Sequence, residues 1–216
     1  MAKKIKVTKD GPYLVIGSIP LLRMKIETDS YGDPYVWREV QRYPLRERYA
    51  LCRCGKSQNM PYCDGAHAMQ RFKGTETASR ERYLDKVKEY IGPELELTDK
   101  PELCVSAGFC DRYAGIWNLT VHSDRPGFKE IAIEEAANCP SGRLVVWDKQ
   151  GNRIEPAYEP SIVVTEDVDG SSGPLWIRGE VEIESADGRI YEKRNRVTLC
   201  KCGKSLNKPL CDGSHL

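Results

Sequence analysis

Six cysteines and two histidines fall into two copies of one pattern, and no other part of the chain carries clearer chemistry. Each copy reads Cys-x-Cys, eight residues, then Cys-Asp-Gly-x-His. The copies align without a gap at an offset of 148 residues, with eleven of sixteen positions identical. Such close agreement between two loops of one chain indicates a shared ligand. The candidate ligand residues are Cys52, Cys54, Cys63 and His67 in the first copy and Cys200, Cys202, Cys211 and His215 in the second.

Three thiolates and one imidazole form a soft donor set that suits zinc or an iron–sulfur cluster. Zinc motifs usually place about two to four residues between the first two cysteines, whereas one residue separates Cys52 from Cys54. Alternate residues of an extended segment share a face, so both sulfurs can bind one iron of a binuclear cluster while Cys63 and His67 bind the other. The spacing therefore favours [2Fe–2S] clusters, with zinc as the alternative.

The two copies resemble the CDGSH iron–sulfur domain, the mitoNEET family. Its signature is Cys-x-Cys, two residues, Ser or Thr, three residues, Pro, one residue, then Cys-Asp-Gly-Ser/Ala/Thr-His. Both copies match it completely, with Ser57 and Pro61 in the first and Ser205 and Pro209 in the second. The resemblance covers about half of the chain. It implies one [2Fe–2S] cluster per copy, bound by the eight residues named above.

The repeat extends upstream of the ligands, because residues 11–17 resemble residues 173–179. Alternation of apolar and polar residues predicts a β-hairpin before the second copy, with strands around 181–184 and 197–199 and a turn at 186–189. The first copy carries about fourteen additional residues, centred on 29–34. In the family, two such halves pair about a two-fold axis, usually as a homodimer. Tandem copies therefore imply an intramolecular pseudo-dimer and a monomeric protein.

Between the copies, a helix is expected over residues 79–90, with Gly92-Pro93 ending it. A second helix should end at Cys139-Pro140, which resembles the last ligand of a bacterial ferredoxin site. The segment resembles a divergent single-cluster ferredoxin domain, yet Ala107 stands where a ligand cysteine is expected. Three thiolates suit a [3Fe–4S] cluster, and the alternative is a decayed fold in which the cysteines only pack. The possible ligands are Cys104, Cys110 and Cys139, with His122 as a weaker substitute.

The expected fold is a mainly β α+β protein in four parts. These are an N-terminal CDGSH half (1–76), a connecting helix and linker (77–100), a divergent ferredoxin-like domain (101–158) and a C-terminal CDGSH half (159–216).

Composition excludes several classes of protein. The chain of 216 residues has a formal net charge of +1, which gives no reason to expect a nucleic-acid partner. It contains neither the apolar run of a membrane span nor the apolar core of a secretory signal, so a cytoplasmic, non-membrane protein is expected. Nine cysteines in such a chain indicate reduced metal ligands.

No catalytic residues are predicted, since two of the three histidines are candidate ligands and no nucleophile motif is present. The sequence therefore predicts a non-enzymatic [2Fe–2S] protein that transfers electrons or whole clusters to an unidentified protein partner. The alternatives are an electron-transferring component of a redox enzyme and a structural zinc protein. Asp64 and Asp212 are expected to cap main-chain amides rather than to transfer protons. Arg53, Lys56, Lys201 and Lys204 either are solvated or offset cluster charge.

Overall fold

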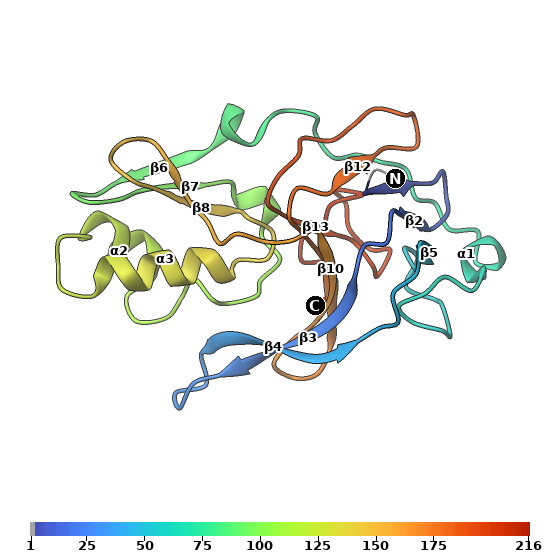
Figure 1. Ribbon diagram of the computed structural model, residues 1–216, viewed down its shortest axis with the longest axis horizontal. Helices are drawn as coiled ribbons and strands as arrows, with labels where there is room; N and C mark the ends of the chain where they lie inside the picture. The colour runs from blue at the N-terminus through green and yellow to red at the C-terminus, as the bar shows by residue number, and fades with distance from the viewer. Residues whose placement is uncertain (1–2) are drawn as a thin grey trace.

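The computed structural model describes residues 3–216, which form three β-sheets and a few short helices. The strands of the two chain ends make up one part of the molecule, and the central segment, from about residue 88 to 154, forms a lobe beside them (Figure 1). None of the helices in the described residues is long and apolar enough to cross a bilayer. The expected mainly β α+β class is confirmed.

Strands of the two CDGSH halves form the first two sheets. The first sheet has the order β12-β1-β2-β5, with bounds Glu182–Glu184, Lys4–Val7, Tyr13–Ile16 and Arg48–Leu51. The second sheet has the order β13-β11-β10-β3-β4, with bounds Arg196–Leu199, Ser172–Arg178, Ser161–Glu166, Leu21–Thr28 and Pro34–Arg42.

Each sheet contains strands from both halves of the chain. Strand β12 of the second half pairs in parallel with β1 of the first, where Ile5 lies opposite Ile183. Strand β3 of the first half pairs in parallel with β10 of the second, where Leu22 lies opposite Val163. Next to these exchanged strands, the two sheets have the same strand order. Strands β1, β2 and β5 of the first sheet correspond to β10, β11 and β13 of the second. The two halves therefore form an intramolecular pseudo-dimer, as the resemblance implied. The exchange of strands between them was not predicted.

The hairpin predicted in the second half is only partly correct. The turn forms, since the Ser185 amide donates to the Arg189 carbonyl at 2.8 Å. However, β13 pairs with β11, and β12 lies in the other sheet beside β1. Ile183 and Val197 are both buried, as their alternation indicated. Alternation shows which face of a strand is buried, whereas it does not show which strand lies next to it.

One apolar core is shared by the two halves. Neither half alone has the apolar surface for an independent core of this size, so the pairing stabilises both. The buried residues from the first half include Ile5, Val7, Tyr13, Val15 and Leu51, and those from the second include Ile162, Leu175, Ile177, Ile183, Val197 and Leu199.

The additional residues of the first copy form the β3–β4 hairpin, which reaches the central lobe. Trp37 of β4 donates from Nε1 to the Asn138 carbonyl at 3.0 Å. Its ring also packs on Phe109, with centroids 5.2 Å apart. A Cβ at Gly108 would lie 2.9 Å from the Pro34 side chain. The insertion therefore braces the loop that carries the central cysteines.

The helix expected over residues 79–90 is wrong. The structure has a 3-10 helix at Tyr83–Lys86 followed by β6 at Lys88–Ile91, which pairs with β7 at Glu96–Asp99. The Tyr83 hydroxyl is fixed by the Thr98 and Arg143 carbonyls, at 2.9 and 2.8 Å. Ile91, at the end of β6, is exposed. Pairing with the central sheet thus overrides the helical pattern, and residues 88–99 belong to the central lobe rather than to a linker.

The central lobe is a four-stranded antiparallel sheet with two helices packed on it (Figure 1). Helix α3 ends at Asn138, immediately before Cys139-Pro140. The predicted position of this helix end is confirmed. A 3-10 helix leads to Cys104, and the one-turn helix α1 follows Gly65 in the first ligand loop. The remaining bounds are Leu144–Trp147 for β8, Arg153–Ile154 for β9, Pro101–Leu103 for the 3-10 helix, Ile116–Val121 for α2, Phe128–Asn138 for α3 and Ala66–Met69 for α1.

Candidate metal centres

The two ligand loops share one main-chain framework. The amide of the first cysteine donates to the proline carbonyl at 2.8 Å in both copies, from Cys52 to Pro61 and from Cys200 to Pro209. The amide of the third cysteine donates back to the preceding strand at 2.9 Å in both, from Cys63 to Ala50 and from Cys211 to Thr198. Bonds within each loop and to the strand that precedes it thus hold the two ends of each candidate ligand set together.

The aspartate of each Cys-Asp-Gly sequence accepts main-chain hydrogen bonds. Asp64 accepts from the amides of Gln58 at 2.7 Å and Ala66 at 3.0 Å. Asp212 accepts from the amides of Leu206 at 2.8 Å and Ser214 at 3.1 Å. The two amides that donate to Asp64 lower its pKa. This arrangement agrees with the predicted capping role.

The donors of each copy lie in two close pairs. Cys52 Sγ is 3.7 Å from Cys54 Sγ, and Cys63 Sγ is 3.3 Å from His67 Nδ1. The corresponding distances in the second copy are 3.8 and 3.6 Å. Two thiolates bound tetrahedrally to one metal at about 2.3 Å lie about 3.8 Å apart, and a thiolate and an imidazole nitrogen lie slightly closer. Each pair therefore fits one tetrahedral metal atom. In residues 3–216 no three His, Cys, Asp or Glu side chains gather closely enough to hold a single ion.

The second site has a carboxylate beside its histidine. His215 Nδ1 faces Cys211, and Nε2 lies 3.4 Å from Asp167 Oδ2, outside hydrogen-bond geometry but within ion-pair distance. Asp167 and then Cys211 raise the pKa of His215 to about 9. A carboxylate beyond a ligating imidazole fixes its orientation and increases its basicity. The sequence offered no signal for Asp167, which is 48 residues from the histidine in the chain.

Two of the four basic residues near the motifs are buried. Arg53, between the first two cysteines of copy one, donates to the Thr8 and Gly74 carbonyls. Lys201, at the same position in copy two, bonds Ser172, and burial lowers its pKa to about 8 although Cys52 and Cys202 act in the opposite direction. Lys201 therefore lies close to thiols of both copies. Lys56 and Lys204 are exposed.

The two ligand loops pack directly against each other. A Cβ at Gly55 would lie 2.5 Å from the Cys202 carbonyl oxygen, and a Cβ at Gly203 would lie 2.8 Å from that of Cys54. Both glycines have positive φ, +72° and +79°. The contact is reciprocal, so the exchanged fold brings the two candidate sites together at their Cys-x-Cys-Gly segments. Glycine is required here both for conformation and for space.

The three central cysteines line one cavity. Cys104, Cys110 and Cys139 surround a space of about 280 Å³, with Arg143 and Trp117 also in its wall. Burial, followed by the negative charge of Asp111, raises the pKa of Cys110 to about 12. Ala107 lines the cavity as well, so the position expected for a fourth thiol faces the same space. His122 is not among the lining residues and bonds the Asn118 carbonyl.

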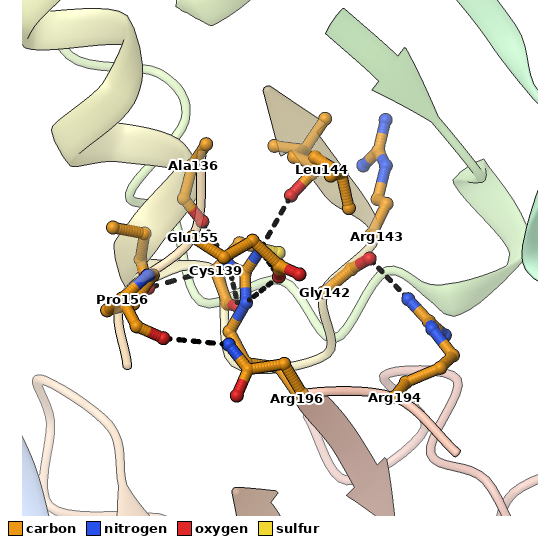
Figure 2. Close-up of polar contacts among 12 residues, drawn as sticks. Ala136, Cys139, Gly142, Arg143, Leu144, Glu155, Pro156, Arg194 and Arg196 are labelled. Atoms are coloured by element: carbon orange, nitrogen blue, oxygen red, sulfur yellow. Dashed lines mark hydrogen bonds and ion pairs between the residues drawn. The ribbon is translucent and has the colours of Figure 1, made fainter. Parts of the chain in front are cut away.

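Arg196 joins the second CDGSH half to the central cavity (Figure 2). It is 1% exposed and pairs with Glu155 at 2.6 Å. It also donates to the carbonyls of Cys139 at 3.0 Å and Leu144 at 3.1 Å, both in the cavity wall, and to that of Ala136. The sequence analysis did not single out Arg196, although Arg-x-x-Leu-Cys precedes the ligands in both copies, at residues 48–52 and 196–200. Its partners lie 41 to 60 positions away in the chain.

Paired thiolate and imidazole donors on two matching loops, with a third cysteine-lined cavity, define an iron–sulfur-binding protein. Comparison with protein families agrees. Residues 10–68 and 172–216 match the family described as iron-binding zinc finger of the CDGSH type, and residues 90–149 match the divergent 4Fe-4S mono-cluster family. The chain is thus a tandem CDGSH protein with a divergent mono-cluster ferredoxin segment between its two copies. Searches of curated proteins and of solved structures gave no significant match.

Proposed function

We propose that the protein transfers electrons through two [2Fe–2S] clusters, one in each CDGSH loop. The observation that carries this proposal is the arrangement of the donors in two pairs per copy, each with the separation that one tetrahedral iron needs. A binuclear cluster requires two such pairs. The zinc alternative would instead require all four donors around one point.

The chain's own residues favour reversible one-electron chemistry at these sites. A bound [2Fe–2S] cluster would supply the redox step, and a neutral imidazole in place of a thiolate removes one negative charge from its ligand set, which favours reduction. The buried cations Arg53 and Lys201 act in the same direction, because they stabilise additional negative charge nearby. The loops are held by buried packing and by main-chain bonds, so little rearrangement should accompany the change in charge.

We propose in addition that the central cavity holds a cluster bound by Cys104, Cys110 and Cys139. Three cysteines that line one cavity of about 280 Å³ are better explained by a bound cluster than by incidental packing, since cysteines that only pack need not line the same cavity. A set of three thiolates, with Ala107 at the fourth position, favours the [3Fe–4S] type. The Arg143 guanidinium, paired with Asp99 at 2.6 Å, lies in the wall and offsets the thiolate charge.

Metal analysis tests both proposals. Purified protein should contain acid-labile sulfide and about seven irons per chain, four from the CDGSH sites and three from the central site. Cys110→Ser should reduce the count to about four, whereas Cys63→Ser should remove about two. Stoichiometric zinc without sulfide would overturn the proposal of [2Fe–2S] clusters, and a count of about four in the unaltered protein would overturn the central cluster alone.

Cluster donation is a second candidate function, favoured by the first site. Cys63 and His67 are partly exposed there, so an acceptor protein has direct access to one donor pair. Incubation of the loaded protein with an apo-ferredoxin distinguishes the functions. Electron transfer leaves the iron in this chain, whereas cluster donation moves iron and sulfide together to the acceptor.

The partner, oligomeric state and compartment follow from the same features. We expect a protein partner that exchanges single electrons and a monomeric chain, because each half already pairs with the other. Light scattering that shows an obligate dimer at micromolar concentration would contradict the monomer. In the described residues all nine cysteines are free thiols, which suits the reducing cytoplasm. An electron-transferring subunit of a redox enzyme remains the alternative, and substrate turnover by the purified chain alone would support it.

A further inference from the structure

The second ligand loop contacts the central cysteine loop. A Cβ at Gly213 would lie 3.5 Å from the Cys104 carbonyl oxygen and 3.6 Å from Ser106 Oγ, which is van der Waals contact. Gly213 lies between the ligand candidates Cys211 and His215, and Cys104 is a candidate ligand of the central site. Two candidate sites therefore meet through main-chain atoms of their own ligand segments.

The first ligand loop has no matching contact. Gly65 occupies the same motif position with nearly the same conformation, φ +88° against +86°, but a Cβ there would meet no atom within 4 Å. The first half reaches the central lobe through the β3–β4 hairpin, where Trp37 bonds Asn138. That contact does not involve the first ligand loop.

Arginine residues of the second half hold this junction in place. Arg196 donates to the Cys139 and Leu144 carbonyls, and Arg194 donates to the Gly142 carbonyl (Figure 2). Arg196 lies in β13, four residues before Cys200. Arg48, at the same position before Cys52, is exposed. In the described residues, the second copy therefore contacts the wall of the central cavity on both sides of its ligand segment, through Arg196 before it and Gly213 near its end, whereas the first copy does not.

We propose that the second CDGSH site is the middle member of a three-site electron path, in contact with the central site through Gly213 and with the first CDGSH site through Gly55 and Gly203. This rests on the proposed function. With clusters bound, one electron would pass from the central site to the second site, so that the central site would be oxidised and the second site reduced. A further transfer would reoxidise the second site and reduce the first, with no bond formed or broken. Reduction of the central site needs an external one-electron donor, for which dithionite serves in the test.

Three variants that each lack one site test the order directly. Cys63→Ser leaves the second and central sites, Cys110→Ser leaves the two CDGSH sites, and Cys211→Ser leaves the first and central sites. Iron and sulfide analysis first establishes which sites are loaded. Electron paramagnetic resonance at graded dithionite reduction then measures magnetic interaction within each remaining pair.

We expect interaction in the Cys63→Ser and Cys110→Ser proteins and its loss in the Cys211→Ser protein. Equal interaction in all three would overturn the order. A central site without iron would overturn the central cluster itself, and the iron analysis identifies that outcome separately from any spectrum.

A glycine pair keeps the test independent of ligand loss. Gly213→Asn and Gly65→Asn introduce the same side chain at nearly the same positive φ, which asparagine tolerates better than most residues. Only the Gly213→Asn side chain meets the central loop. With all sites loaded, Gly213→Asn should weaken the interaction between second and central sites, and Gly65→Asn should leave it unchanged. If the two substitutions changed the interaction equally, or if neither changed it, the contact at Gly213 would not be the route between the second and central sites.

Discussion

The two CDGSH copies have the same ligand loop in different surroundings. The main-chain bonds of the two loops agree within about 0.1 Å at four corresponding positions, whereas the surfaces outside the loops differ. The first loop has an exposed Arg48 and open space at Gly65, and the second has a buried Arg196 and a neighbour at Gly213. The comparison teaches that local bonds within the motif specify the ligand set, and packing outside it specifies which neighbour each site has.

The largest difference is expected for the two equivalent arginines. Arg196→Met should cost about 3–5 kcal/mol of unfolding free energy, because it leaves Glu155 and buried carbonyls without their partner. Arg48→Met, at an exposed position, should change stability by less than about 0.5 kcal/mol. Urea unfolding of both variants measures the difference. Similar costs would mean that the two copies are not distinguished by their packing.

The contact between the two loops predicts the next effect. Gly55→Ala places a Cβ 2.5 Å from a main-chain oxygen of the other copy, and only a backbone shift can relieve that overlap. The cost should exceed that of Gly188→Ala, which has φ +86° and open space around it, by about 2–4 kcal/mol. Thermal unfolding with matched iron loading measures both. Equal losses of stability in the two variants would mean that only the positive φ is strained and that the two copies do not contact each other at Gly55.

A buried carboxylate in the central lobe should make stability depend on pH. Both oxygens of Glu135 are buried without a hydrogen-bond partner in residues 3–216, and burial raises its pKa to about 8. The unfolded chain loses this proton near pH 4.5, so the cost of Glu135 grows as pH rises from about 4.5 to 8 and then levels off.

Glu135→Gln removes this titration. The variant should gain stability relative to the unaltered protein as pH rises, by on the order of 2 kcal/mol at pH 8.5, because local relaxation reduces the full effect of the shift. The difference between the two proteins should be smallest at pH 5.5, the lowest pH of the measurement. Urea unfolding between pH 5.5 and 8.5, with cluster content followed by visible absorbance, measures the difference. A difference independent of pH would contradict a buried, titrating Glu135.

The smallest effects on folding are expected at the two candidate ligand histidines, where a bound cluster should respond more than the fold. His67→Cys and His215→Cys should each lower the reduction potential of their own site, because a thiolate adds one negative charge. The decrease should be larger at His215, whose side chain is 3% exposed, because an added charge acts more strongly in a buried site. Acid should release iron more slowly from either variant, since protons compete with metal for imidazole. Potentiometry and absorbance after acid addition measure both, and unchanged values would mean that these residues are not ligands.

The sequence alone determined the parts that depend on short separations. Each candidate ligand set spans sixteen residues, and its bonds stay within the loop or reach the adjoining strand. The motif therefore predicted the grouping of Cys52, Cys54, Cys63 and His67, and of their counterparts, without the fold. The same holds for the capping by Asp64 and for the helix that ends immediately before Cys139. The pseudo-dimer was implied by the family resemblance together with the tandem copies.

Only the tertiary structure decided what lies next to each motif. The exchange of β3 and β12 and the placement of Asp167 beside His215 join residues far apart in the chain. The pairing of β6 with its neighbour β7, which replaced the predicted helix, depends on β8 holding β7 in the central sheet. Arg48 and Arg196 precede identical Leu-Cys sequences, yet one is solvated and the other is the junction to the central cavity. A periodic pattern records that a face is buried, whereas the partner that buries it is set by the packing of the whole chain.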